Sequence, residues 1–295
     1  MLKSLLRVKP IEPAGRVDAG EPVEGSLQGE ATLQRTLTAK HLIMLGIGAV
    51  IGAGIFVMTG QAAANHAGPA VMLSFVFAGI ACTFAGLCYA EFAAMMPVSG
   101  SAYSYSYATL GEGIAWFIGW CLVLEYLFAG SSVAVAWSAY LISFITGTLG
   151  LPFPTELTNA PLAWINGEFV ASGNILNLPA VLIVAAVSGL CYVGITQSAF
   201  INAIVVAIKI AVICLFVGFG AAYIDPANWH PFIPENTAPG VFGWSGVFRA
   251  ASIVFFAYIG FDAVSTSAGE TKDPQRNMPI GILGSLAVCT IIYII

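Results

Sequence analysis

The sequence predicts an all-α polytopic membrane protein. Of its 295 residues, 58% are hydrophobic and only 8% are charged, and the mean hydropathy is +0.88. Soluble domains carry about 25% charged residues, so this composition excludes an ordinary soluble protein. Apolar stretches long enough to cross a bilayer recur along the chain. We expect seven membrane spans, at residues 42–64, 71–95, 114–146, 177–195, 199–223, 246–269 and 279–295.

The distribution of basic residues predicts the orientation. Residues 1–37 form a polar tail rich in Gly, Pro and Glu, which we expect to be disordered and cytoplasmic. Six of the ten basic residues precede the first span, and two more lie in the 270–278 loop. The loops at 65–70, 147–176 and 224–245 contain no Lys or Arg. Because basic residues favour the cytoplasmic side, we predict a cytoplasmic N-terminus and one multi-pass domain over residues 38–295.

Three segments between and within the spans carry further expectations. The third apolar run exceeds one crossing, so we expect it to tilt or to extend past the bilayer. The segment 97–112, PVSGSAYSYSYATLGE, is predicted either as a short amphipathic helix at the inner face or as a plain loop. The last span ends at Ile295 without a flanking charge, so we expect a fragment of a longer protein.

The six cysteines lie in apolar spans without metal-site spacing, and we expect them to be buried hydrophobic residues.

A run of glycines predicts that the first span is interrupted. Residues 46–56 read GIGAVIGAGIF, and each Gly costs about 1 kcal/mol relative to Ala inside a helix. Irregular backbone at membrane depth is tolerated only where it is buried in protein or lines a cavity. The run therefore predicts a binding site near the membrane midplane.

A second, weaker break is predicted in the sixth span. The segment FFAYIGFDAVS places Gly260 between aromatic and β-branched residues. An isolated Gly in a membrane helix is more often a close helix contact. Spans 1 and 6 are, however, the corresponding first helices of two halves in a five-plus-five inverted repeat, and paired interrupted spans indicate a transporter site.

Three ionisable residues lie near the middle of apolar spans, namely Glu125, Lys209 and Asp262. Each costs about 2.5–3.5 kcal/mol at a helix centre, so each is expected to face a cavity or a partner; a buried ion pair that fixes helix register is the alternative. A desolvated lysine can release its proton near neutral pH. Lys209 is therefore predicted to couple transport to a proton. Sodium would need a cluster of oxygen ligands, so no bound sodium, metal or cofactor is expected.

The groups at the two interrupted spans together predict an α-amino acid as the ligand. The N–H groups of residues 52–54, at the start of a half-helix, favour a carboxylate. Carbonyls freed near Ala257–Gly260 suit an ammonium group, and Phe256 and Tyr258 are predicted to wall off an apolar side chain. The chain has no HExxH, P-loop or Gly-x-Ser-x-Gly motif, so we expect neither an enzyme nor an ATP-driven pump. We expect no nucleic-acid partner, and the sequence leaves the oligomeric state open.

The chain resembles amino acid permeases of the amino acid–polyamine–organocation superfamily, in the branch of cationic amino acid transporters, and is most similar to bacterial ApcT-type permeases. The resemblance rests on MLGIGAVIGAGIFV, FINAIVVAIKIAV, FFAYIGFDAVSTSAGETKDPQRNMPIGI and the segment from Gly68 to Glu112. It implies the leucine-transporter fold with about a dozen helices. The chain would hold the first repeat and the start of the second, in a bacterial plasma membrane.

The resemblance also implies roles for individual residues. The family's carboxylate-binding loop falls on Val50, Ile51, Gly52, Ala53 and Gly54. Its substrate-lining positions fall on Phe256 and Ile259, beside Ala257 and Gly260; its proton-linked lysine falls on Lys209, and two acidic positions near the site fall on Glu125 and Asp262. Ala53 departs from the family, which usually has Ser or Thr there, so a hydroxyl that could help bind the carboxylate is missing.

The sequence therefore predicts a secondary transporter that imports amino acids with protons, by alternating access around the unwound middles of spans 1 and 6. The alternative is a non-transporting amino acid sensor or an inactive fragment of such a permease. Which amino acid is carried, cationic or neutral, stays open.

Overall fold

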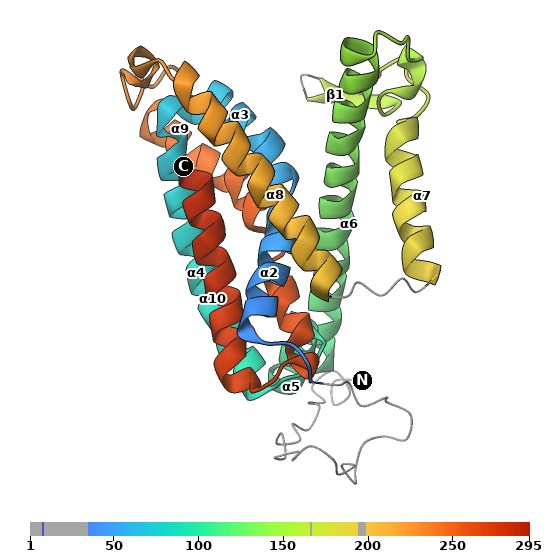
Figure 1. Ribbon diagram of the computed structural model, residues 1–295, viewed down its shortest axis with the longest axis vertical. Helices are drawn as coiled ribbons and strands as arrows, with labels where there is room; N and C mark the ends of the chain where they lie inside the picture. Colours follow the sequence, from blue (N-terminus) through green and yellow to red (C-terminus); the bar gives the residue numbers. More distant parts are fainter. Residues whose placement is uncertain (1–7, 9–34, 166, 194–198) are drawn as a thin grey trace. The chain divides into compact units, whose positions relative to one another are not determined.

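The computed structural model describes residue 8 and residues 35–165, 167–193 and 199–295 of the chain. These residues are mostly helical, which confirms the predicted fold class (Figure 1). They divide into two compact units, one formed by Met1–Leu122 with Ser198–Ile295 and the other by Val123–Gln197. The predicted tail at 1–37 lies almost entirely outside the described residues.

The first unit contains most of the helices. In chain order they are α2 (Ala39–Val50), η1 (Gly54–Met58), α3 (Thr59–Ala62), η2 (Ala63–Ala67), η3 (Gly68–Ala70), α4 (Val71–Met95), α5 (Ser101–Thr109), the start of α6 (Glu112–Ser143), α8 (Ala199–Gly220), η6 (Ala221–Tyr223), η7 (Pro226–Trp229), α9 (Gly243–Val254), η8 (Phe255–Tyr258), η9 (Asp262–Glu270) and α10 (Pro274–Ile294). The segment at 97–112 thus contains a helix, α5, rather than only a loop.

Both predicted interruptions are present. The first span begins after Thr38, which is extended and forms a capping box with His41. It leaves the helix at Ile51, whose φ and ψ are −73° and 101°, and resumes as the π-helical turn η1. The sixth span leaves the helix at Ile259, where ψ is 133°, and resumes as η9.

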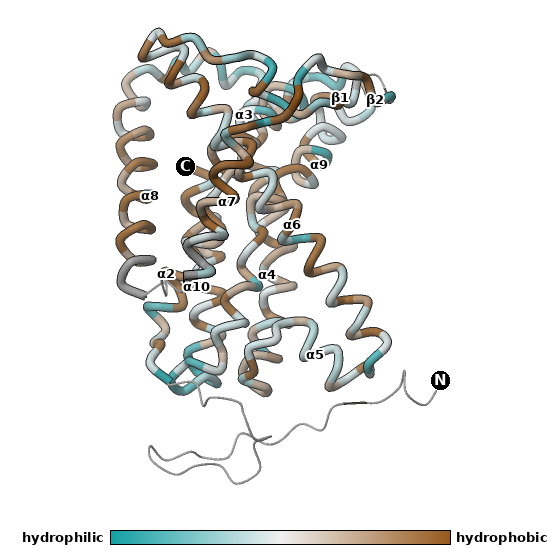
Figure 2. Tube along the Cα trace, turned by 90° about the vertical axis from the view of Figure 1, so that its right-hand side faces the viewer, coloured by the Kyte–Doolittle hydropathy of each residue, from teal (hydrophilic) through white to brown (hydrophobic). Residues whose placement is uncertain are grey.

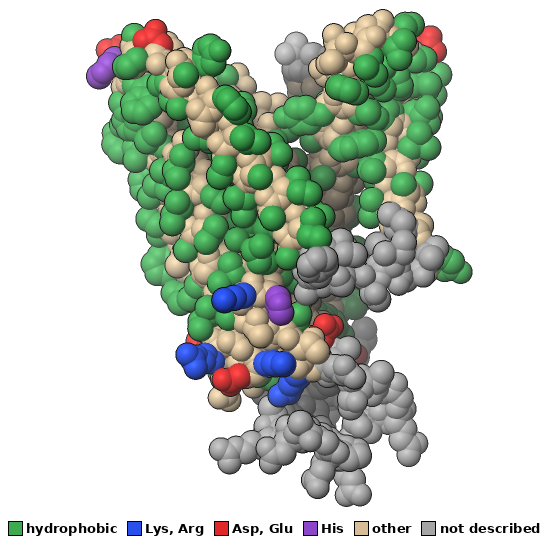
Figure 3. Space-filling view, in the orientation of Figure 1, with side chains coloured by type: hydrophobic (Ala, Val, Ile, Leu, Met, Phe, Trp, Pro, Cys, Tyr) green, Lys and Arg blue, Asp and Glu red, His purple; other side chains and the backbone are tan. Residues whose placement is uncertain are grey.

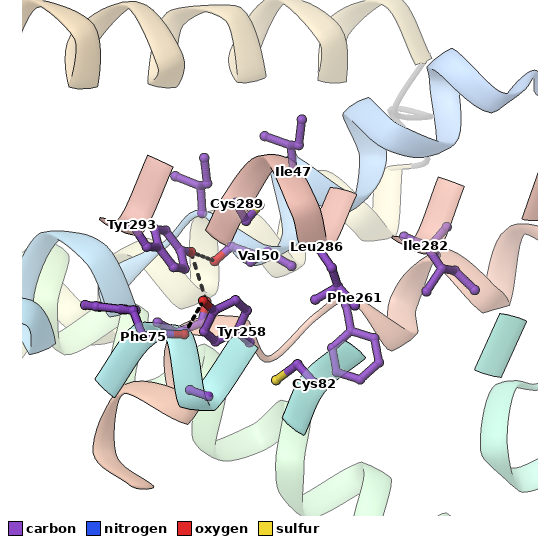
Figure 4. Packing of buried hydrophobic residues seen from close by; sticks show 14 of the residues in the cluster. Ile47, Val50, Phe75, Cys82, Tyr258, Phe261, Ile282, Leu286, Cys289 and Tyr293 are labelled. Carbon is purple, nitrogen blue, oxygen red and sulfur yellow. Dashed lines mark hydrogen bonds between the residues drawn. The ribbon is translucent and has the colours of Figure 1, made fainter. Parts of the chain in front are cut away.

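Glycines allow α10 to pack closely along α2 and α4. A Cβ atom at Gly281 of α10 would lie 2.5 Å from the Leu42 Cβ of α2, and one at Gly86 of α4 would lie 2.7 Å from a methyl group of Leu286. Only a residue without a side chain permits such an approach, as in other closely packed membrane helices. These contacts enclose a core that Figure 4 shows from close by.

The second unit consists of the rest of α6, η4 (Phe144–Thr148), η5 (Thr155–Leu157), a hairpin of β1 (Leu162–Ile165) and β2 (Glu168–Ala171), and α7 (Leu178–Val193). Ser138 of α6 donates to Asn177 Oδ1 at 2.6 Å, and the same oxygen accepts from the Ala180 N–H at 3.1 Å and so caps α7. The hairpin, in which Trp164 pairs with Phe169, was not predicted in the 147–176 loop.

Helices lie in all seven predicted spans. Five described stretches are long and apolar enough to cross a membrane, while Ala39–Val50 and Leu178–Gly189 are shorter apolar helices. The helix α10 begins at Pro274, before the predicted start of the last span at 279, and Pro279 lies inside it. Proline suits the first turn of a helix, and Pro274 rather than Pro279 takes that place.

In each unit the hydrophilic residues lie mainly at the ends of the helices. In Figure 2 the helical segments are largely hydrophobic, and the hydrophilic residues gather in the turns. On the face shown in Figure 3, Lys and Arg side chains gather at the end of the first unit where α2 and α10 begin. This end carries Arg35, Lys40, Lys272 and Arg276.

Candidate functional site

The interrupted spans 1 and 6 touch at their breaks. A Cβ atom on Gly54 would lie 2.4 Å from both the Cα and the Cβ of Ala257, far inside van der Waals contact. Gly54 opens the helical stretch that follows the first break, and Ala257 belongs to the last helical turn before the second. A glycine at 54 is therefore what allows the two breaks to meet.

Gly260 supplies the backbone turn of the second break. Its φ is +111°, in a region that residues with a side chain rarely adopt. A Cβ atom there would also lie 3.0 Å from the carbonyl carbon and oxygen of Ala49 in α2. Both the conformation and the close approach to span 1 require glycine.

Spans 1 and 6 are also tied together at both of their ends. At the end where α2 begins, the isolated parallel bridge between Leu37 and Thr271 is flanked by the Lys272 N–H, which donates to the Leu37 carbonyl at 2.9 Å. At the other end, His66 Nδ1 lies 2.9 Å from the Gly240 carbonyl. The breaks thus lie within one pair of spans that is joined at three levels.

Lys209 of α8 binds the backbone at the end of α2. Its Nζ donates to the carbonyl oxygens of Gly48 and Ile51, at 3.0 Å in each case. The last carbonyls of a helix have no partner within it and carry the negative end of its dipole. The lysine therefore satisfies acceptors that the break in span 1 leaves open.

Two tyrosines hold the backbone around the breaks, a role that sequence reasoning gave to neither of them. Tyr293 of α10 lies with its hydroxyl 3.1 Å from the Val50 carbonyl and 2.9 Å from the Ala257 carbonyl, one on each interrupted span (Figure 4). Tyr258 donates to the Phe75 carbonyl of α4 at 3.1 Å. The expectation that Tyr258 walls off a ligand side chain was wrong, because it is fully buried and points into α4. The sequence does contain a signal for this role: a tyrosine within an apolar span predicts a buried hydroxyl, which needs a hydrogen-bond partner.

The remaining predicted residues divide by burial. Around the breaks, Val50, Ile51, Gly54, Ala257 and Gly260 are buried, whereas Gly52, Ala53, Phe256 and Ile259 are half-buried. The carbonyls of Val50, Ile51 and Ala257 are engaged by Tyr293 or Lys209. The groups to consider for a ligand are therefore the N–H groups around Gly52–Gly54, the other carbonyls of the 255–259 turn and the side chains of Phe256 and Ile259.

The two acidic residues fall in different places. Asp262 is buried at the start of η9, and its carbonyl accepts from the Ser265 hydroxyl at 2.6 Å. Ser265 also lies 2.9 Å from the Ser101 hydroxyl of α5. Glu125 lies on α6 in the second unit. Asp262 thus lies in the unit that contains the breaks.

Tyr105 of α5 lies beside this hydroxyl pair. Burial raises the pKa of Tyr105 to about 12, against a smaller lowering by Ser265. Within the described part of the chain the buried Tyr105 hydroxyl has no partner in hydrogen-bonding geometry, which is consistent with Ser265 already being bound to Asp262 and Ser101. Tyr105 thus stays a neutral phenol at physiological pH.

Comparison with known proteins gives a consistent result. A family model described as amino acid permease matches residues 37–295. The chain is 52% identical over 266 residues to the branched-chain amino acid permease BcaP of Bacillus subtilis, covering 90% of this chain and 54% of the relative. It is 46% identical to a methylthioribose transporter of the same organism, over 99% of this chain and 58% of the relative. It is 38% identical to the vacuolar cationic amino acid transporter 2 of Arabidopsis thaliana, over 99% of this chain and 43% of the relative. The chain spans about half the length of these relatives.

Proposed function

Because this chain belongs to the amino acid permease family, we propose that it forms the substrate-binding part of a secondary transporter that imports amino acids together with protons. The observation that carries the proposal is the contact of the two helix breaks at Gly54 and Ala257, with Lys209 bound beside it. The chain spans about half of the length of its relatives, so transport by the whole protein is part of this proposal.

The breaks offer complementary groups to the two ends of an amino acid. The first N–H groups of the helical stretch that begins at Gly54 have no partner within that helix and lie at the positive end of its dipole. They bind the carboxylate. The carbonyls of the 255–259 turn bind the ammonium group, and the half-buried Phe256 and Ile259 contact the side chain of the substrate.

Lys209 links this site to a proton. As an ammonium it donates to both the Gly48 and the Ile51 carbonyl. A neutral amine loses its charge and one donor, so it holds the end of α2 less tightly. Protonation therefore stabilises the span-1 break in the geometry seen here, and release of the proton to the other side of the membrane frees it. A charged lysine at this place also repels sodium, so the proton is the coupling ion.

The orientation follows from the basic end of the first unit. Since Lys and Arg favour the cytoplasmic side, the end where α2 and α10 begin faces the cytoplasm of a bacterial cell. Transport then proceeds by alternating exposure of the breaks to the two sides of the plasma membrane.

The relatives define the substrates to test. Their names specify branched-chain amino acids, methylthioribose and cationic amino acids. A thermal-shift screen of the purified full-length protein against the twenty amino acids and methylthioribose measures binding, because a ligand stabilises the state that it binds. Uptake of any binder into proteoliposomes, with and without an inward proton gradient, then measures coupled transport.

Stabilisation by one or more amino acids together with uptake that depends on the gradient is the expected result. Binding without uptake would favour a sensor instead, and stabilisation by methylthioribose alone would move the substrate away from amino acids.

A further inference from the structure

Tyr258 connects the span-6 break to a span that lies outside the proposed site. It is the last residue of η8, directly before Ile259 leaves the helix and Gly260 turns the chain. Its side chain points the other way, into α4, where its hydroxyl donates to the Phe75 carbonyl at 3.1 Å (Figure 4). Position 258 is therefore the point at which the break is attached to α4.

The ring of Tyr258 is packed as tightly as its hydroxyl. Its centroid lies 6.5 Å from that of Phe75 and 5.3 Å from that of Tyr293, and the side chain is fully buried. Gly79 lies one turn along α4 and leaves room for this hydroxyl. A Cβ atom at Gly79 would lie 3.1 Å from the hydroxyl oxygen and 3.0 Å from Thr290. The hydroxyl thus donates to the Phe75 carbonyl and has the Thr290 side chain as its second polar neighbour.

Packing alone does not explain the hydroxyl. A phenylalanine would make the same ring contacts and would bury no polar group, and burying a hydroxyl yields little net stability even when it is bonded. The Phe75 carbonyl also belongs to α4, where the helical ladder supplies it with a backbone partner. What the bond adds is direction, because it fixes the rotation of the last helical turn before the break.

We propose that Tyr258 is a positioning residue for the substrate, which acts through its hydrogen bond to Phe75 by orienting the carbonyls of the 255–259 turn toward the amino group. This inference rests on the proposed function of the breaks. It assigns to α4 a part in substrate affinity although Phe75 itself is almost fully buried.

Two independent substitutions in the full-length protein test it. Tyr258→Phe removes only the hydroxyl, and Gly79→Ala crowds the same hydroxyl from α4. Each should raise KM for uptake, and the dissociation constant in the thermal-shift titration, about tenfold, which corresponds to one net hydrogen bond. Vmax and the melting temperature without amino acid should stay near their wild-type values. In the double variant the two effects should not add, because the alanine at position 79 then no longer meets the Tyr258 hydroxyl.

Two controls separate position from stability. Phe75→Leu keeps the carbonyl acceptor but removes the ring, so it should lower the melting temperature while KM changes little. Tyr223→Phe removes the hydroxyl of a tyrosine that is 89% exposed, and it should change neither.

Unchanged KM in Tyr258→Phe, with wild-type uptake intact, would overturn the inference and leave the proposed function standing. A lower melting temperature at unchanged KM would overturn it as well, because Tyr258 would then be only structural. Absence of amino acid binding by the wild type would overturn the proposed function itself, and the inference with it.

Discussion

Replacing Gly54 with alanine is the smallest change that drives the two helix breaks apart. The added methyl group would lie 2.4 Å from the Cα and Cβ of Ala257, whereas non-bonded carbons prefer about 3.5–4.0 Å. The two segments must therefore separate by about 1 Å, or the backbone must distort. The neighbouring atoms belong to the Ala257 backbone and its Cβ, so no flexible side chain can move aside.

The expected cost follows from this overlap. Overpacking by a methyl group costs about 1–3 kcal/mol. If this cost destabilises only the ligand-bound state, it corresponds to about a 5- to 150-fold loss of affinity. Because the carboxylate and the amino group are held by opposite breaks, a shift of about 1 Å between them weakens both contacts. We expect the dissociation constant for the amino acid to rise at least tenfold, and Gly54→Leu to abolish binding.

Gly60→Ala is the matched control within the same span. A Cβ atom at Gly60 meets no atom within 4 Å, and alanine is the better helix former. It should leave the dissociation constant unchanged in the thermal-shift titration of the full-length protein. Wild-type affinity in Gly54→Ala, in a protein that remains folded by size-exclusion chromatography, would refute the role of the contact between the breaks.

Two further substitutions test the surroundings of the breaks. Gly260→Ala places a side chain at a φ of +111° and should lower the free energy of unfolding by about 1–3 kcal/mol; an unchanged melting temperature in detergent would argue against this strain. Tyr105→Phe removes a buried hydroxyl without a partner in the described part of the chain, so it should raise the melting temperature or leave it unchanged. Because burial raises the pKa of Tyr105 from 10.0 to about 12, the stability that this residue contributes is complete below pH 10 and is lost as the pH rises toward 12. The alkaline fall in melting temperature should therefore be shallower in Tyr105→Phe, and equal slopes would contradict the shifted pKa.

The sequence was most informative where one residue type has a strong local effect. Four glycines within one apolar run predicted an interrupted span, and the helix leaves its course at Ile51. Gly260 gave a weaker signal because a single membrane glycine also serves close packing, and here it does both: it turns the chain and approaches Ala49. Length and hydropathy sufficed to locate the helices, and α10 begins at Pro274, ahead of the predicted span.

Contacts between distant residues could not be predicted in the same way. The Tyr293 hydroxyl meets a carbonyl 243 residues away, and the Tyr258 hydroxyl meets one 183 residues away. Both acceptors are backbone atoms, so no residue type in the sequence marks them. The β-hairpin went unrecognised because its strands are four residues each and lie in a loop without helical or strand periodicity.

Proton coupling through Lys209 is the central claim, and pH-gradient-driven uptake by Lys209 variants of the full-length protein tests it most directly. Lys209→Ala removes the donor to Gly48 and Ile51, and Lys209→Arg keeps a charge that is not released. Both variants should lose the acceleration of amino acid uptake by an inward proton gradient in proteoliposomes. Acceleration equal to that of the wild type in Lys209→Ala would contradict the account.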